Sequence, residues 1–409
     1  MNSTTSTPFR RCIGSISALW AAALPGVVGR ICAGRRILAR VIAIGAVAGS
    51  LPVIAADDPR YAELYPSPAR FVTQTFAEHD VVFLSEYHMI AQNLTFLASL
   101  LPDLYKAGVY NLGWEFAHQK DQALIDKLLS GPIYDEALSA TIMLSWRHPG
   151  RLVWGYKEYE DVFRAAWRLN KALPGGVRKF RIVALNTPVV WQSWEYPGDS
   201  RETQYWLSWI DQNVFWANVI MTEIVGKGEK ALIFCGNGHT TTRFYQDRGA
   251  SKSITAGNIV YHSIGKRAYR VLLHGSAEGL LARGSLRRIE DAIAQLPRSG
   301  AAFGTHLKDS PLGKLDIETK GYVDGKSSGF TLSDYADGYV YLAPVVDWKP
   351  LTVIPGFINE RNRWVVQMSM LGYRPGEAEK SVAELNALME RRAGKVIDDL
   401  LQRYRADSP

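Results

Sequence analysis

The chain has 409 residues, 47% hydrophobic and 21% charged, which excludes a disordered or low-complexity protein and is enough to bury a sizeable core. Its formal net charge of +7 comes almost entirely from residues 1–56, which contain six arginines but no lysine and no acidic residue. Without these six, the 47 basic residues fall to 41 against 40 acidic ones. The remainder therefore lacks the basic stripe expected of a nucleic-acid-binding protein.

Residues 1–56 have the pattern of an export signal. Arginines precede an apolar run at residues 41–50, which is short and rich in small residues, and further small residues around Ala55 offer a cleavage site. The run is too short for a comfortable membrane span, so we expect no stable span after its removal. Residues 34–40 match a twin-arginine signal loosely, and the general secretory route is equally open. We expect a mature chain that starts near Asp57 and is periplasmic or secreted.

Downstream, strand-like apolar runs alternate with helical periods, which is typical of an α/β fold with an open, mainly parallel sheet and helices on both faces. Helices are expected at residues 68–78, 91–107, 121–129, 159–172, 202–225 and 286–296. Strands are expected at residues 81–88, 109–115, 180–186, 230–239, 258–264 and 337–344. We expect one domain over residues 57–371, with an insertion or lid at about 275–333, and a C-terminal amphipathic helical extension at 372–409.

The first predicted strand, Val81-Val-Phe-Leu-Ser-Glu-Tyr-His88, ends in an acid and a histidine two positions apart. Side chains alternate along an extended backbone, so Glu86 and His88 point to the same side. Ligands of open α/β sheets bind beyond the carboxyl ends of the strands, so this Glu-x-His is placed for chemistry. Either residue alone is more often a solvated strand end.

Two later strands end on similar residues. Glu115 closes a second apolar run, and His239 follows a third through Gly236 and Gly238, which permit a tight turn. Asn186, at the end of a further strand, is expected at the same edge of the sheet. The sequence therefore predicts a site in which two acids and two imidazoles line one crevice.

Other polar and aromatic residues have simpler interpretations. The segment around residues 145–159 contains Arg147 and His148, and a proline-bounded surface loop explains it better than substrate contact. Trp191 and Trp194 precede a helix and are candidates for contact with a flat or apolar ligand. Cys235 is the one cysteine after the leader, so no internal disulfide is expected there, and it is interpreted as a small buried hydrophobe.

This order of motifs resembles the Tiki, erythromycin-esterase and ChaN-like haem-uptake superfamily, and is closest in arrangement to the ChaN-like branch. The match covers roughly residues 71–265, with a weaker echo at 336–342. The acidic and imidazole positions of the family fall on Glu86, His88, Glu115 and His239. The resemblance implies the fold more firmly than the reaction, because the superfamily contains metal-dependent peptidases, esterases and haem binders.

The sequence departs from the family pattern around its first motif. Ser85 replaces the glycine expected before the acid, and Met89, Gln92 and Asn93 replace the Asp and the further His that often follow. The resemblance therefore gives no support for a second metal or an extended imidazole cluster.

The leading hypothesis is an exported hydrolase that acts on an ester or amide of a small molecule or peptide. His88, Glu115 and His239 could hold a divalent metal while the other glutamate serves as general base for a water molecule. Without a metal, His88 could deprotonate water directly while Glu86 or Glu115 orients it. The sequence leaves both mechanisms open, and the oligomeric state as well.

The alternative is a haem-binding protein without turnover. It rests on the ChaN-like arrangement and on tyrosines that could supply an axial oxygen ligand. These are Tyr87, Tyr105, Tyr110, Tyr156 and Tyr159.

Overall fold

The computed structural model describes residues 64–146, 153–187, 201–247 except 245, 252–275, 284–296, 300–317, 330–371, 376 and 379–406. These all lie in one compact unit, Ala55–Pro409. The predicted leader, Arg147, His148, Trp191 and Trp194 lie outside the described residues. Within the described ranges, no helix is both long enough and apolar enough to span a bilayer.

An eight-stranded sheet forms the centre of the fold, in the order β1-β9-β10-β8-β2-β5-β3-β4. From β10 to β4 each strand is parallel to its neighbours, and β9 runs antiparallel to both β10 and β1. The predicted α/β fold with a mainly parallel sheet is confirmed. The strands are β1 (Leu64–Tyr65), β2 (Val81–Glu86), β3 (Asn111–His118), β4 (Arg181–Asn186), β5 (Ala231–Gly236), β8 (Ala268–Leu273), β9 (Phe303–His306) and β10 (Gly338–Tyr341). Strands β6 (Gln246–Asp247) and β7 (Lys252–Ser253) form a separate antiparallel pair.

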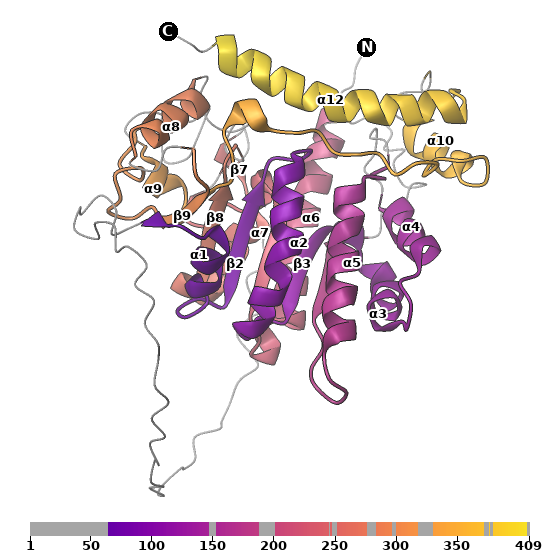
Figure 1. The fold of residues 1–409 in the computed structure, drawn as a ribbon, viewed down its shortest axis with the longest axis horizontal. Helices are drawn as coiled ribbons and strands as arrows, with labels where there is room; N and C mark the ends of the chain where they lie inside the picture. The colour runs from indigo at the N-terminus through magenta and orange to yellow at the C-terminus, as the bar shows by residue number, and fades with distance from the viewer. Residues whose placement is uncertain are drawn as a thin grey trace, which may run out of the picture. The chain divides into compact units, whose positions relative to one another are not determined.

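Helices cover both faces of the sheet, as predicted (Figure 1). One face carries α1 (Pro68–Thr75), α2 (Ala91–Lys106), α3 (Gln122–Ser130), α4 (Glu136–Ser145) and α5 (Lys157–Ala172). The other carries α6 (Arg201–Glu223), α7 (Ala256–Ile264), α8 (Ser285–Ala294) and α9 (Leu332–Tyr335). The C-terminal part contains α10 (Arg363–Leu371) and the long α12 (Val382–Ala406).

The alternation of side chains along β2 explains why helices are needed on both sides. Val82 and Leu84 pack against the α2 and α5 face, whereas Val81 and Phe83 pack against α6 and α7. All four are fully buried, so β2 has no solvated face and reads in the sequence as a continuous apolar run.

The order of the strands places the predicted site residues together. Strand β5 lies between β2 and β3, although it follows both in the chain. Glu86 is therefore in register with Gly236, and the carboxyl ends of β2, β5 and β3 meet at one edge. After β2 the chain continues to β3 in one direction along the sheet, and after β5 it continues to β8 in the opposite direction. Such a reversal of strand order is a topological switch point, where α/β proteins bind ligands.

Helix α12 crosses this carboxyl edge, over the ends of α2 and α5 in Figure 1. Its Ile397 and Leu400 pack with Ile90, the residue just before α2, and with Trp348. Nearer its start, Leu385, Met389 and Ala393 join the main core, which contains Trp154 and Tyr156. The predicted amphipathic C-terminal helix is thus an integral part of the cover over this edge.

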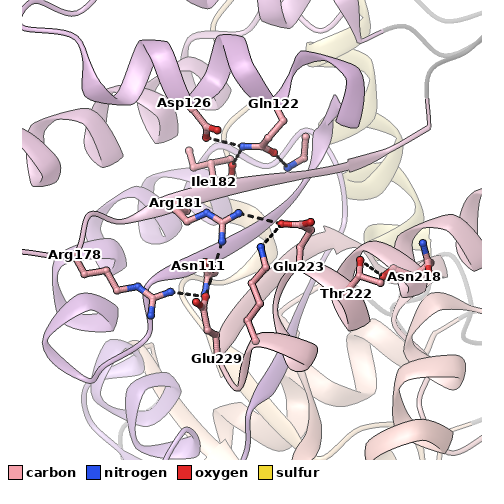
Figure 2. A network of polar contacts seen from close by, with 12 residues as sticks. Asn111, Gln122, Asp126, Arg178, Arg181, Ile182, Asn218, Thr222, Glu223 and Glu229 are labelled. Atoms are coloured by element: carbon pink, nitrogen blue, oxygen red, sulfur yellow. Dashed lines mark hydrogen bonds and ion pairs between the residues drawn. The ribbon is translucent and has the colours of Figure 1, made fainter. Parts of the chain in front are cut away.

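Ion pairs connect residues at the opposite edge of the sheet, where the parallel strands begin. Arg181 at the start of β4 pairs with Glu223 at 3.3 Å, and the Arg178 guanidinium pairs with Glu229 (Figure 2). Asn111 donates to the same Glu229 carboxylate at 2.8 Å. The hydrogen bond from Lys227 lowers the pKa of Glu223. The pKa of Glu229 is lowered as well, so these two acids are favoured in their charged form, in contrast to Glu86 at the carboxyl edge.

Three parts of the sheet differ from the sequence prediction. Residues 258–264, predicted as a strand, lie in helix α7, because Thr255 and Asn258 form a capping box and the helix packs Ala256 and Val260 against α6. Strand β8 was not predicted, since the single arginine in Ala268–Leu273 interrupts its apolar run. Strand β9 lies inside the predicted insertion at 275–333 and extends the main sheet. The expected strand at 337–344 and helix at 286–296 are confirmed as β10 and α8.

Candidate functional site

Glu86 and His88 form the centre of the candidate site, and they point to the same side as predicted. Glu86 is the last residue of β2, and its Oε1 lies 2.9 Å from His88 Nδ1. The Tyr159 hydroxyl, from α5, donates to the same Oε1 at 3.0 Å. Because carboxylate oxygens accept and Tyr159 donates, the contact with Glu86 places the His88 proton on Nδ1. The imidazole therefore has one fixed tautomer in its neutral form.

Glu86 is an unusual acid because the fold leaves half of its carboxylate without a partner. Its side chain is fully buried, and Oε2 has no hydrogen-bond partner among the described residues. Burial raises the pKa of Glu86, although the hydrogen bond and charge of His88 oppose that shift. Glu115 adds to the increase through like-charge repulsion. Such a group is costly to the fold and typical of functional sites.

Glu115 faces the other nitrogen of the same imidazole. Its Oε1 lies 3.8 Å from His88 Nε2, which is beyond direct hydrogen-bonding distance. Its Oε2 accepts the backbone N–H of Gly236 at 2.6 Å, so the end of β5 fixes the end of β3. The His88 side chain is 27% exposed and the Glu115 side chain 6%. Solvent therefore reaches this site from the His88 side.

Gly236 makes room for the His88 ring. A Cβ atom on Gly236 would lie 2.8 Å from both Cε1 and Nε2 of His88 and 3.5 Å from Glu115 Oε2. The backbone of Gly236 has φ −57° and ψ 140°, which any residue can adopt. The first glycine of the Gly-x-Gly-His motif is needed here for close approach and not for its backbone angles.

The backbone just after His88 is strained. Met89 has φ 75°, and only one other non-glycine residue in the described part of the chain, Asp309, has a positive φ. A left-handed conformation at a residue with a long side chain costs on the order of 1–2 kcal/mol. Met89 turns the chain between His88 and the start of α2, so the strain lies at the site itself.

His239 is held at the same edge by a separate set of contacts. It ends the short 3-10 turn η4 (Asn237–His239) that follows β5, and its Nδ1 lies 3.0 Å from Asn213 Oδ1 on α6. Asn213 Oδ1 also accepts the backbone N–H of Ala256, so the oxygen faces both donors and the His239 proton is on Nδ1. The ring packs on Trp216 with 4.2 Å between centroids.

A chain of contacts connects His239 to Glu115. Trp216 donates its indole N–H to Asn186 Oδ1 at 3.2 Å, and the Asn186 amide donates to the backbone carbonyl of Glu115. Asn186 is the last residue of β4 and lies at the expected edge of the sheet. Glu86 ends β2, His88 and His239 lie in turns, and Glu115 lies inside β3, which continues to His118 beyond the predicted end. Glu86, His88 and Glu115 form one contact group, and His239 is joined to it through Asn186.

Aromatic rings form the wall beside His88. Phe116 and Trp154 contact the imidazole edge-on, at centroid distances of 5.5 and 5.6 Å. Trp146 packs on Trp154 at 4.9 Å, and both are buried. The surface loop was predicted for Arg147 and His148, which lie outside the described residues. The space among the rings is too small for a water molecule, so this wall is dry.

The predicted metal-ligand set does not form a metal site in this structure. His88, Glu115 and His239 are all described, yet the described part of the chain contains no group of three or more His, Cys, Asp or Glu side chains placed to hold a metal ion. His88 and His239 each direct Nδ1 to a different protein acceptor, which ties the two rings to separate parts of the edge.

The tyrosines considered as haem ligands have other roles. Tyr105 and Tyr110 precede β3 and so lie at the edge opposite Glu115, where Tyr105 donates to the Arg178 carbonyl at 2.7 Å. The other three pack or bond within the fold: Tyr156 donates to the Met389 carbonyl, Tyr159 to Glu86, and Tyr87 packs with the residues beneath α12.

Sequence reasoning missed the residues that orient the site. Tyr159 binds Glu86, the partner of His88, and Asn213 is itself the partner of His239. Both residues come from helices whose packing no local pattern reveals. Arg270 could have been found from the sequence, because it is a lone charge inside the apolar strand Ala268–Leu273. Cys235 is fully buried as predicted, and burial raises the pKa of its thiol well above the ordinary value.

Of three comparisons with known proteins, only the one with solved structures found matches. No family model matches the sequence, and no curated protein matches it. The erythromycin esterase EreC in its open conformation is 10% identical over 67% of this chain and 92% of its own, with a TM-score of 0.46. A succinoglycan biosynthesis protein is 10% identical over 71% of this chain and 94% of its own, with a TM-score of 0.49.

A third solved structure, the haem-binding ChaN of Campylobacter jejuni, is 16% identical over 49% of this chain and 84% of its own, with a TM-score of 0.32. At these identities the likeness concerns the fold alone. The solved structures that resemble this chain include the erythromycin-esterase and ChaN branches named by the sequence resemblance, one an esterase and the other a haem binder.

Proposed function

We propose that this chain is a hydrolase of ester or amide bonds in which His88 is the general base. One observation carries the proposal: the two ring nitrogens of His88 face two carboxylates, Nδ1 lying 2.9 Å from Glu86 and Nε2 3.8 Å from Glu115. A half-buried imidazole placed between two acids is suited to accept and return a proton.

Glu86 fixes the tautomer that the reaction needs. Because Nδ1 carries the proton that Glu86 accepts, Nε2 is the nitrogen that can take a proton from water. As the water oxygen attacks the carbonyl carbon, that proton passes to Nε2 and His88 becomes positively charged. The buried Glu86 carboxylate then lies 2.9 Å from the new charge and stabilises it. His88 returns the proton to the leaving oxygen or nitrogen as the carbonyl re-forms.

Glu115 orients the nucleophile in this scheme. The 3.8 Å between Glu115 Oε1 and His88 Nε2 is too long for a direct hydrogen bond, so a water molecule bound by both atoms would be held close to the base. The Gly236 N–H keeps the other carboxylate oxygen in place. Orientation of this kind reduces the entropy cost of bringing water to the carbonyl.

His239 is assigned to the substrate side of the reaction. Its Nδ1 proton is committed to Asn213, and its position is fixed by Trp216. In the proposed reaction the positive charge of a protonated His239 would stabilise the oxygen on which negative charge develops.

The export of the mature chain remains part of the proposal. N-terminal sequencing of protein recovered from its host tests it: a start near Asp57 supports export, and an intact Met1 opposes it.

The hydrolase proposal is tested with a panel of activated and natural esters and amides. We expect the wild type to hydrolyse at least one substrate, and Glu115→Gln and His239→Gln to reduce the rate by about 10²–10⁴-fold. Glu229→Gln, which alters an acid of the opposite edge, is the matched control and should retain the wild-type rate. Haemin is titrated in parallel. A Soret shift at a 1:1 ratio together with no turnover on any substrate would contradict the proposal and favour haem binding.

A further inference from the structure

Arg270 is a fully buried arginine in the middle of the sheet. Arg270 belongs to β8, which pairs with β2, and 0% of its surface is exposed to solvent. Its side chain leaves the sheet on the α6 and α7 face, opposite the face that Glu86 enters, because Arg270 is in register with Phe83. The side chain therefore does not reach solvent or substrate directly.

The guanidinium of Arg270 binds neutral acceptors from separate elements. Nε donates to Thr240 Oγ1 at 3.0 Å, Nη1 donates to the Tyr335 carbonyl at 2.7 Å, and Nη2 donates to Asn237 Oδ1. The Tyr335 ring lies against the guanidinium at 4.4 Å from its centroid. The planar fork of an arginine can serve three diverging acceptors at once, which a lysine cannot do in the same way.

No acid neutralises this cation within the part of the chain that the structure describes. The nearby carboxylate of Asp337 is used elsewhere: Oδ2 accepts the backbone N–H of Arg270 at 2.9 Å, and Oδ1 pairs with Arg243 at 3.1 Å. A buried charge without an opposite charge is costly to the fold, and a polar side chain of similar size would be less so. The arrangement calls for an explanation beyond packing.

Two of the three acceptors of Arg270 lie at the two ends of the turn that carries His239. Asn237 begins η4, and Thr240 follows His239 and closes the turn with its N–H on the Asn237 carbonyl at 3.2 Å. Ser85, the residue before Glu86, donates to Thr240 Oγ1 at 2.7 Å. The guanidinium therefore binds both ends of the turn, and Thr240 connects the turn to the end of β2 through Ser85.

We propose that Arg270 is a positioning residue for the hydrolytic site: it holds the turn between Asn237 and Thr240, so that His239 keeps its place at the carboxyl edge and the end of β5 keeps its place beside His88. This inference rests on the proposed function and adds a residue to it. It also explains why Ser85 fits where the family has glycine, because the Ser85 hydroxyl supports the same turn.

The test compares Arg270→Lys and Arg270→Met with Arg243→Met in the full chain. Arg243 is 38% exposed at its side chain and pairs with Asp337, so its replacement is the matched control. On the best panel substrate, we expect Arg270→Met to lower kcat at least tenfold with KM changed less than about twofold, and Arg270→Lys to fall in between. Arg243→Met should behave as the wild type. Folded fraction is measured by circular dichroism on every sample, and kcat is taken per folded molecule.

Amide hydrogen exchange provides a second measurement that needs no substrate. We expect faster exchange at residues 238–240 in Arg270→Lys than in the wild type, with exchange in β2 unchanged. A kcat per folded molecule within twofold of the wild type, or unchanged exchange in the turn, would overturn the positioning role. If the wild type hydrolyses nothing, the hydrolase proposal fails, and the exchange measurement still decides whether Arg270 holds the turn.

Discussion

Replacing Glu86 by glutamine tests the electrostatic account of the site without needing a substrate. The variant keeps the shape of the side chain and an oxygen that accepts from His88 and Tyr159, and it removes the titrating group. The pKa of Glu86 is raised by burial, so its ionised form is less favourable in the folded chain than in the unfolded one. The wild type should therefore lose stability relative to Glu86→Gln as the pH rises above the ordinary value of 4.5.

The size of this effect follows from proton linkage. Between pH 4.5 and the raised pKa, the folded wild type holds one more proton than the unfolded chain. The free energy of unfolding of the wild type, relative to that of Glu86→Gln, should thus fall by about 1.4 kcal/mol per pH unit across this window and become constant above it. Below pH 4.5 the difference is constant as well, because Glu86 is protonated in both states.

Urea unfolding of both proteins from about pH 4 to about pH 6 measures this difference. Glu384→Gln is the control with the opposite sign, because the Ser381 hydroxyl lowers the pKa of Glu384 at the start of α12. Its contribution is present above the ordinary pKa and is lost as the pH falls. A wild-type advantage over Glu86→Gln that grows with pH in the same window would refute the reasoning, since it would mean that the fold favours the ionised carboxylate.

Three further substitutions have expected outcomes. Gly236→Ala should displace the His88 ring, because the new Cβ lies 2.8 Å from it, and should lower kcat by about 10²-fold while the melting temperature changes little; normal kcat would show that the ring position is not critical. Tyr159→Phe removes a hydrogen bond that favours the charged form of Glu86, so its pKa rises further and the acid limb of the pH–rate profile moves to higher pH; a shift to lower pH would contradict this sign. Met389→Ala leaves a cavity beneath α12 and should cost about 2–5 kcal/mol in urea unfolding, and a loss below about 1 kcal/mol would show that α12 is not part of the core.

Much of the site could be predicted because parallel sheets convert short sequence patterns into positions. Glu86 and His88 are two residues apart at the end of a buried strand, and they contact the same space as alternation requires. Glu115 ends another apolar run, and it reaches the same imidazole. These patterns do not reveal the order of the strands in the sheet. The position of β5 between β2 and β3, which brings Gly236 against His88, depends on which strands pair.

The errors have a common physical origin, since tertiary contacts decide where local patterns are ambiguous. Residues 258–264 contain β-branched residues and still form a helix, because the Thr255 capping box starts it and α6 buries one side. Arg270 breaks the apolar pattern of β8, and its burial depends on acceptors in distant segments.

The most direct test of the central claim is the turnover number of His88→Gln on the best ester or amide of the panel. His262→Gln, which alters an exposed histidine of α7 bonded to its own helix, is the matched control. We expect His88→Gln to lose about 10²–10⁴-fold in kcat while it remains folded, and His262→Gln to keep the wild-type rate. A folded His88→Gln protein that turns over the substrate within about twofold of the wild type would contradict the assignment of His88 as the general base.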